Sequence, residues 1–131
     1  MRDHRKLKAF DLADGLAVEI YRVTGDFPRS ELFGLTSQMR RAAISVAANI
    51  VEGCAREGLK EYLNFLNLAF GSLRELAYFI DLSHRPGFLP EDTARALLRR
   101  EDECARTLTG LIRSLRAKAS SPQAPRPMPQ A

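Results

Sequence analysis

The run from Gln38 to Gly53, QMRRAAISVAANIVEG, most constrains what this chain can fold into. It contains no proline, its only glycine is its last residue, and it is rich in alanine, so it is predicted to be helical. At about 100° per residue, six polar side chains fall within one narrow sector of this helix and form a polar stripe. These residues are Gln38, Arg41, Ser45, Asn49, Glu52 and Arg56.

Apolar side chains occupy two further sectors of the same helix. One is an ordinary core stripe that includes Met39, Val46 and Ile50, and the other is a second apolar face. The next helix repeats this pattern beside its main core stripe. Leaving both additional faces in water would expose more apolar surface than monomers usually tolerate. We therefore predict self-association through Phe33, Ile44, Val51, Leu63 and Phe70. The alternative is that another helix of the same bundle covers them.

Glycine and proline divide the chain into four helical segments. Breaks at 25–28, 58 and 86–87 predict helices over 11–24, 36–57, 59–83 and 90–118, and no segment alternates with the period of a strand. Short connections favour an all-α, antiparallel, up-down-up-down four-helix bundle. The predicted organisation is a basic N-terminal segment (1–9), the bundle (10–118) and a disordered tail (119–131) that holds four of the seven prolines.

Residues around the second helix also carry a family resemblance. The segment from Leu35 to Ser45, then Asn49-Ile50 and Glu52-Gly53, resembles the signature of small four-helix-bundle proteins encoded by intervening sequences in bacterial large-subunit (23S) ribosomal RNA genes. The resemblance covers roughly residues 10 to 115. It implies a ring-like homopentamer without known catalytic residues. Related accessory proteins of diversity-generating retroelements share that architecture, which implies RNA or DNA and a reverse transcriptase as partners.

The polar stripe of the second helix has two interpretations. In the first, its charged and amide side chains form a binding surface or a catalytic constellation. In the second, they form a partly buried network with Glu75 or Ser72 of the third helix, or with Glu101, which lies in the apolar stripe of the fourth. Buried polar pairs fix the register of packed helices at some cost in stability. We favour the structural network, which comprises Gln38, Arg41, Ser45, Asn49, Glu52, Arg56 and Glu75.

Residues typical of catalysis are few. His4 lies in a start expected to be disordered and His84 in a loop, and neither has the spacing of a metal ligand to a cysteine or another histidine. The chain has no phosphate-binding glycine motif and no Glu-x-x-His pair of the kind that holds di-metal sites in bundles. We expect no enzyme activity, no metal and no cofactor. Cys54 and Cys104 within apolar helical patterns, and the lack of a membrane-length apolar run, favour a cytoplasmic protein with no membrane partner.

Charge offers the clearest indication of function. Twenty Lys and Arg against sixteen Asp and Glu give a net charge of +4, with excess positive charge in 1–9 and 91–118. A pentamer would carry about +20 and repeat these patches around a ring. We predict phosphate contacts at Arg2, Arg5, Lys6, Lys8, Arg95, Arg99, Arg106 and Arg113. The alternative is an ordinary surface held by local salt bridges.

Two functions are therefore consistent with the sequence. The first is a non-enzymatic oligomer that binds RNA or DNA backbones electrostatically. The second is a protein-interaction scaffold or accessory subunit for which nucleic acid is irrelevant. Backbone binding weakens steeply as salt rises, whereas an apolar protein contact does not.

Overall fold

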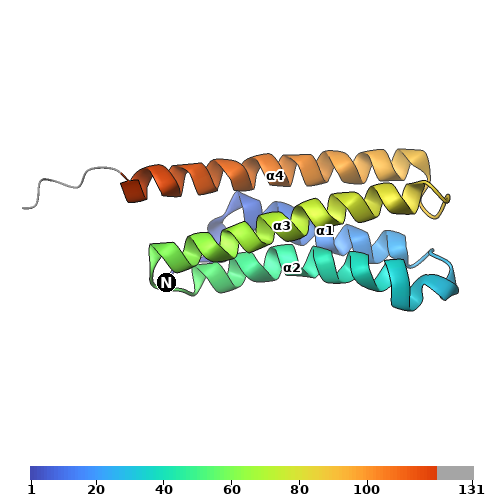
Figure 1. Ribbon diagram of the computed structural model, residues 1–131, viewed down its shortest axis with the longest axis horizontal. Coiled ribbons are helices and arrows are strands. Elements are labelled where there is room, and N and C mark those ends of the chain that lie inside the picture. The colour runs from blue at the N-terminus through green and yellow to red at the C-terminus, as the bar shows by residue number, and fades with distance from the viewer. Residues whose placement is uncertain (121–131) are drawn as a thin grey trace, which may run out of the picture.

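The computed structural model describes residues 1–120, which form four helices packed side by side along a common long axis (Figure 1). The helices are α1 (Lys8–Thr24), α2 (Ser37–Cys54), α3 (Leu59–His84) and α4 (Glu91–Ser120). Residues 1–120 contain no strand, so the predicted all-helical four-helix bundle is confirmed. The predicted tail, apart from its first two residues, lies outside the described part of the chain.

A single apolar core lies between the four helices. α1 packs against α2 and α4, and α3 packs against the same two helices, so each helix turns one stripe inward. The stripe predicted for the second helix is buried at Met39, Val46 and Ile50. Other large, fully buried side chains of the core come from the remaining three helices: Leu16, Ile20, Tyr62, Leu66, Leu73, Leu76, Ile80, Leu97 and Leu108.

The second helix ends earlier than predicted, at Cys54 instead of residue 57. The amides of Ala55 and Arg56 already donate to carbonyls three residues back, which tightens the last turn. A close approach of α2 to α3 accompanies this ending: a Cβ on Gly53 would lie 2.9 Å from Cβ of Phe65. Gly58 is therefore the extended residue before α3 and not the residue that ends α2.

At its other end, α2 is preceded by two short helical turns, Arg29–Glu31 and Leu32–Thr36. Gly34 interrupts the second turn with non-helical backbone angles, φ −107° and ψ −112°. The Glu31 side chain accepts a hydrogen bond from the amide of Leu35 across this bend. The bend places Phe33, one of the predicted interface residues, outside the bundle, where 92% of its surface is exposed.

The N-terminal segment is ordered, contrary to our expectation for His4. The amide of Arg2 donates to the carbonyl of Cys54 at 2.9 Å, and its guanidinium lies 4.1 Å from the centre of the Tyr62 ring. His4 packs edge-on against Phe10. The first residues therefore cover the end of the bundle where α2 turns into α3 (Figure 1), and Lys8 already belongs to α1. Cation–π and backbone contacts from distant elements, which have no local sequence pattern, account for this order.

Candidate functional site

The polar stripe of α2 forms a chain of hydrogen bonds along the helix surface. Arg41 donates to Gln38 at 2.7 Å, Asn49 donates to the carbonyl and hydroxyl of Ser45, and Arg56 pairs with Glu52 at 2.9 Å. One contact crosses to the neighbouring helix, where the hydroxyls of Ser45 and Ser72 share a hydrogen bond of 2.8 Å. Six of the seven residues of the predicted network thus have polar partners, and all but the Ser45–Ser72 contact lie within α2 and the turn that follows it.

Glu75, the seventh residue, is exposed, and its side chain makes no hydrogen bond or ion pair among residues 1–120. The buried carboxylate of the bundle is Glu101 on α4, which is 3% exposed. Its partner is Arg74, at 3.2 Å and 3.3 Å from the two carboxylate oxygens. Burial raises the pKa of Glu101, while the nearby Arg74 guanidinium partly opposes that rise. The polar stripe of α2 does not reach this pair.

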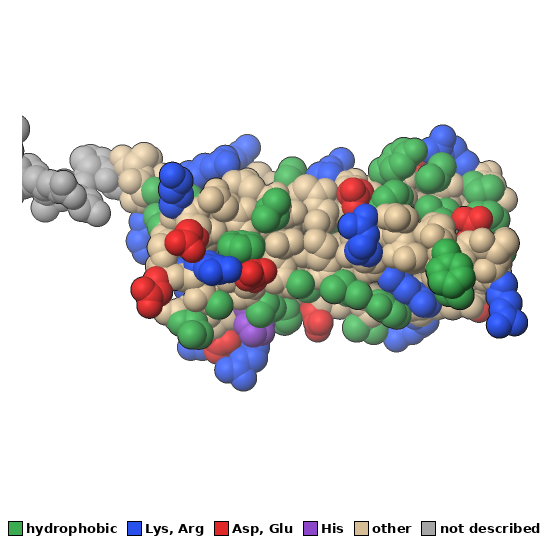
Figure 2. Space-filling view, turned by 60° about the horizontal axis from the view of Figure 1, so that its bottom comes forward, with side chains coloured by type: hydrophobic (Ala, Val, Ile, Leu, Met, Phe, Trp, Pro, Cys, Tyr) green, Lys and Arg blue, Asp and Glu red, His purple; other side chains and the backbone are tan. Residues whose placement is uncertain are grey.

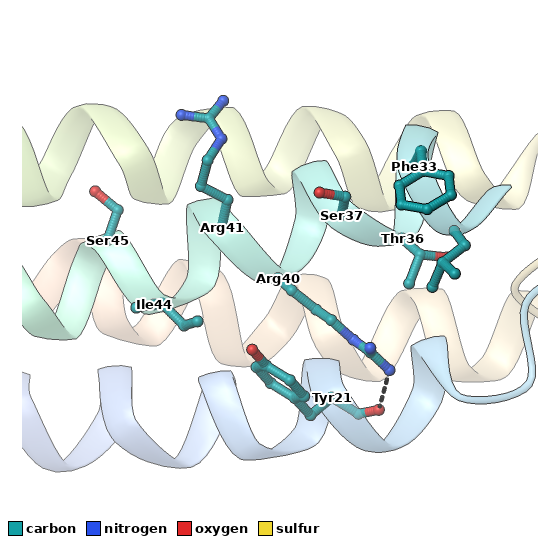
Figure 3. Close-up of a pocket in the computed structure, with 9 residues that line it drawn as sticks. Tyr21, Phe33, Thr36, Ser37, Arg40, Arg41, Ile44 and Ser45 are labelled. Atoms are coloured by element: carbon teal, nitrogen blue, oxygen red, sulfur yellow. Dashed lines mark hydrogen bonds between the residues drawn. The ribbon is translucent and has the colours of Figure 1, made fainter.

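An apolar groove of about 620 Å³ lies on the α1–α2 face, and we call it the α1–α2 groove (Figure 3). The side chains of Tyr21 and Arg40 point toward each other across it: the guanidinium lies 4.6 Å from the centre of the ring and donates to the carbonyl of Tyr21 at 3.3 Å. Arg41 points away from α1. The lining residues are Tyr21, Leu32, Phe33, Thr36, Ser37, Arg40, Arg41, Ile44 and Ser45.

The five predicted interface residues occupy two different sides of the bundle. Phe33 and Ile44 line the α1–α2 groove, where Ile44 is 46% exposed, and Val51 on α2 is half-buried. Leu63 and Phe70 instead pack against the subunit's own core and line hollows between α3 and α4. Figure 2 shows hydrophobic side chains in a row along the lower edge of one face and at its right end, with basic side chains among them.

Most of the predicted phosphate contacts already have partners within the chain. Arg5 pairs with Asp3, Lys8 with Glu103, Arg95 with Glu91, and Arg106 with Asp102. The hydrogen bonds from Arg5 lower the pKa of Asp3. Arg2 donates to the carbonyl of Arg56 and stacks on Tyr62. Within residues 1–120, Lys6, Arg99 and Arg113 form no ion pair.

Two cations that the sequence analysis did not single out line the surface between α3 and α4 that also includes Arg113. Lys60 on α3 and Arg116 on α4 line the hollows between these helices, together with Asn64 and Asn67. A signal for them was present in the sequence. Residues 104–120 contain four cations and no carboxylate, whereas our count over the whole of 91–118 averaged that stretch with an acidic one.

The core contains three side chains that could act as nucleophiles, Cys54, Tyr62 and Cys104, and all three are buried. Burial raises the pKa of Cys104 to about 12, and its thiol points to the carbonyl of Ala9 at 3.8 Å. Burial likewise raises the pKa of Tyr62 to about 12 and that of Cys54 above its usual value. Raised thiol and phenol pKa values leave both groups protonated and poorly nucleophilic at neutral pH.

In the described range, no group of three or more His, Cys, Asp and Glu side chains is placed to hold a metal ion. Nor is any helix of residues 1–120 both long enough and apolar enough to cross a bilayer.

Known proteins resemble this chain in both sequence and fold. The model of the family described as "23S rRNA-intervening sequence protein" matches residues 5–110. The fold is similar to a crystal structure, at 1.70 Å resolution, of a protein with unknown function from the S23 ribosomal protein family of Bacteroides thetaiotaomicron VPI-5482. The TM-score is 0.75 at 22% identity, over 80% of this chain and 95% of that chain. No curated protein matches the chain.

Proposed function

Because this chain belongs to the family of 23S rRNA-intervening sequence proteins, we propose that it is a non-enzymatic protein whose copies assemble and bind RNA or DNA backbones. In this proposal the antiparallel, up-down-up-down bundle is the subunit of a ring-like homopentamer. The observation that carries it is the α1–α2 groove, whose apolar side chains remain exposed in a single subunit.

Assembly is supported by the kind of side chain that the groove leaves in water. Phe33, Leu32 and Ile44 are large apolar residues, each at least 46% exposed, and all three line the same groove. Burying such a side chain against a second copy contributes about 1.5–3 kcal/mol. A few of these contacts per interface can offset the cost of association, which a smaller apolar patch cannot.

Nucleic-acid binding is supported by charge. Each copy carries a net charge of +4, and a closed ring would repeat every basic patch at regular intervals. Repetition raises both the steering of an anionic polymer and the number of counterions released when it binds. The ion pairs at Arg5, Lys8, Arg95 and Arg106 reduce what those residues can contribute, so the unpaired cations carry this part of the proposal.

Light scattering on the purified protein tests assembly. The wild-type chain is expected to have the mass of a pentamer, and the double variant Phe33→Ser/Ile44→Ser that of a smaller species with a similar helical circular-dichroism spectrum. Leu68→Ser is the matched control, because Leu68 is 58% exposed on α3 and does not line the groove. A wild-type monomer at micromolar concentration would contradict the assembly proposal.

A salt titration tests nucleic-acid binding. Retention of a fluorescein-labelled RNA is expected to fall steeply between about 50 and 200 mM salt, as counterion release requires. The second candidate function, a scaffold or an accessory subunit for a partner protein such as a reverse transcriptase, is favoured by the same exposed groove. Assembly without any RNA or DNA binding at low salt would support that candidate and exclude the first.

A further inference from the structure

Two hollows of about 400 and 250 Å³ lie next to each other between α3 and α4, and both are lined by Asn67 and Arg116. Their polar side chains come from both helices. We call the surface that these residues form the α3–α4 groove: Lys60, Asn64, Asn67, Thr109, Arg113 and Arg116.

The six residues form two matching rows. On each helix the three positions are spaced i, i+4 and i+7, so they lie on one face and extend over about 10 Å of helix. The rows meet at one point, where Arg116 donates to the side-chain oxygen of Asn67 at 3.4 Å. The groove therefore presents a continuous line of donors from the two helices.

No carboxylate lines the two hollows. α4 has no Asp or Glu between residues 104 and 120, and the one carboxylate of α3 between residues 60 and 74, Glu61, lines neither hollow. In the described part of the chain, Lys60, Arg113 and Arg116 take part in no ion pair. Elsewhere on α4, Arg95 pairs with Glu91 and Arg106 pairs with Asp102, both at i and i+4.

Cations without a carboxylate partner are the ones that can bind an external anion at little cost. An Arg already held in an ion pair must lose that contact or share it, whereas an unpaired guanidinium exchanges only water and counterions. Asn amides and a Thr hydroxyl add neutral donors of the kind that contact phosphate oxygens. Leu63 and Phe70, two of the apolar residues that line these hollows, are partly buried against the core of the subunit.

We propose that the α3–α4 groove is the site that holds the phosphodiester backbone of RNA or DNA, with Arg113, Arg116 and Lys60 as its phosphate-binding cations. This inference rests on the proposed function and specifies where on the subunit binding takes place. Of the cations that the sequence analysis selected, this site keeps only Arg113, and it adds Lys60 and Arg116 at the same end of the bundle.

Fluorescence anisotropy with a fluorescein-labelled oligouridylate and with a labelled RNA duplex tests the site. Arg113→Glu/Arg116→Glu is expected to weaken binding at least about 10-fold. The matched control, Arg95→Glu/Arg106→Glu, changes the net charge by the same amount on the same helix at two cations already held in ion pairs, and is expected to change affinity less than about 3-fold. Losing two phosphate contacts should also lower the slope of log K against log salt by about 1.4 for the single strand.

A third variant separates binding from folding. Thr109→Glu places a carboxylate four residues before Arg113, in the order that favours an ion pair along a helix. It is expected to weaken RNA binding while leaving the melting temperature unchanged or slightly higher. A loss of binding in this variant therefore cannot be attributed to unfolding.

The outcomes distinguish failure of the site from failure of the function. If the wild-type protein binds neither RNA, the proposed function fails. If it binds but the groove and control variants weaken binding equally, or the control weakens it more, the groove is not the site while the function stands. Binding to phosphatidylserine vesicles without binding to RNA would also overturn the inference. A stronger effect on one of the two RNA probes identifies which form the groove accepts.

Discussion

The two halves of α4 both contribute to the core and differ in charge. Residues 91–103 contain five carboxylates and three cations, whereas residues 104–120 contain four cations and no carboxylate. Both halves turn buried residues toward the core, Leu97 in the first and Leu108 in the second. Apart from the buried Glu101, the charge difference therefore lies on the outer surface of the helix.

This comparison shows why the net charge of a helix is a poor guide to where it binds an anion. The cations of the first half lie one turn from carboxylates, and two of them, Arg95 and Arg100, lie within 4 Å of one. In the second half only Arg106 has such a neighbour, Asp102, whereas Arg113, Arg116 and Lys118 have no carboxylate within one turn on their own helix. Averaged over the helix, the two halves look mildly basic. Separately, one is internally compensated and the other offers its charge to a ligand.

The largest expected effect is on the free energy of unfolding, and it tests whether the core is packed equally well beneath the two halves of α4. Leu97→Ala and Leu108→Ala each remove a fully buried side chain and are expected to lower the free energy of unfolding by about 2–5 kcal/mol. Guanidinium unfolding followed by circular dichroism measures both. A cost below about 1 kcal/mol for Leu108→Ala alone would show that the second half is loosely packed and would break the comparison.

A smaller difference in the free energy of unfolding is expected between two arginines: Arg74, which pairs with the first half of α4, and Arg116, which lies in the second half. Arg74→Ala removes the partner of the buried Glu101 carboxylate and is expected to cost about 1–3 kcal/mol. Arg116→Ala, which lies in the second half and makes one long hydrogen bond to Asn67, is expected to stay within about 0.5 kcal/mol of wild type. The same unfolding measurement compares them, and equal costs would count against this distinction.

The smallest expected effect is a pH dependence of the free energy of unfolding, which arises from Glu101 in the first half of α4. Because burial raises the pKa of Glu101 in the folded protein above its ordinary value of 4.5, the folded state keeps this proton longer than the unfolded state does. The contribution of Glu101 to stability is therefore greatest at low pH and falls as pH rises past that value. The variant Glu101→Gln has an amide in place of this carboxyl group and cannot titrate, so it serves as the reference.

The free energy of unfolding of the wild type, relative to Glu101→Gln, is thus expected to decrease between about pH 4 and pH 7. Urea unfolding at several pH values measures this difference. Glu103→Gln serves as the control, because Glu103 is half-exposed on the same helix and its pairing with Lys8 is long, at 3.9 Å. A difference that stays constant or increases with pH would show that Arg74 outweighs burial at Glu101.

Sequence reasoning reached the fold because the fold depends on periodic patterns. Apolar residues such as Met39, Val46 and Ile50 repeat at helical spacing, and the breaks at glycine and proline are local signals. The end of α2 was misplaced by three residues because the close contact of Gly53 with Phe65 on α3 has no local signature. Order in the first residues was missed for the same reason, since Arg2 is held by Tyr62 from a distant helix.

The candidate sites were harder to reach, because each depends on residues that only the fold brings together. The α1–α2 groove joins Tyr21 to Phe33 and Ile44, and the α3–α4 groove joins Lys60 to Arg113 and Arg116. The sequence supplied some members of each group but not their neighbours. It also did not show which cations are neutralised within the chain, which the ion pairs of Arg95 and Arg106 settle.

The contact of Arg2 with the turn between α2 and α3 has a practical consequence for how the protein is attached to a surface or a label. It fixes the first residue at the same end of the bundle as the last turn of α4 (Figure 1). A fusion partner at Met1 would thus lie at the end of the bundle that also carries Lys60 and Arg116 of the α3–α4 groove. The turn between α3 and α4 at the far end, around residues 85–87, is the better place for a fluorophore or an immobilising tether.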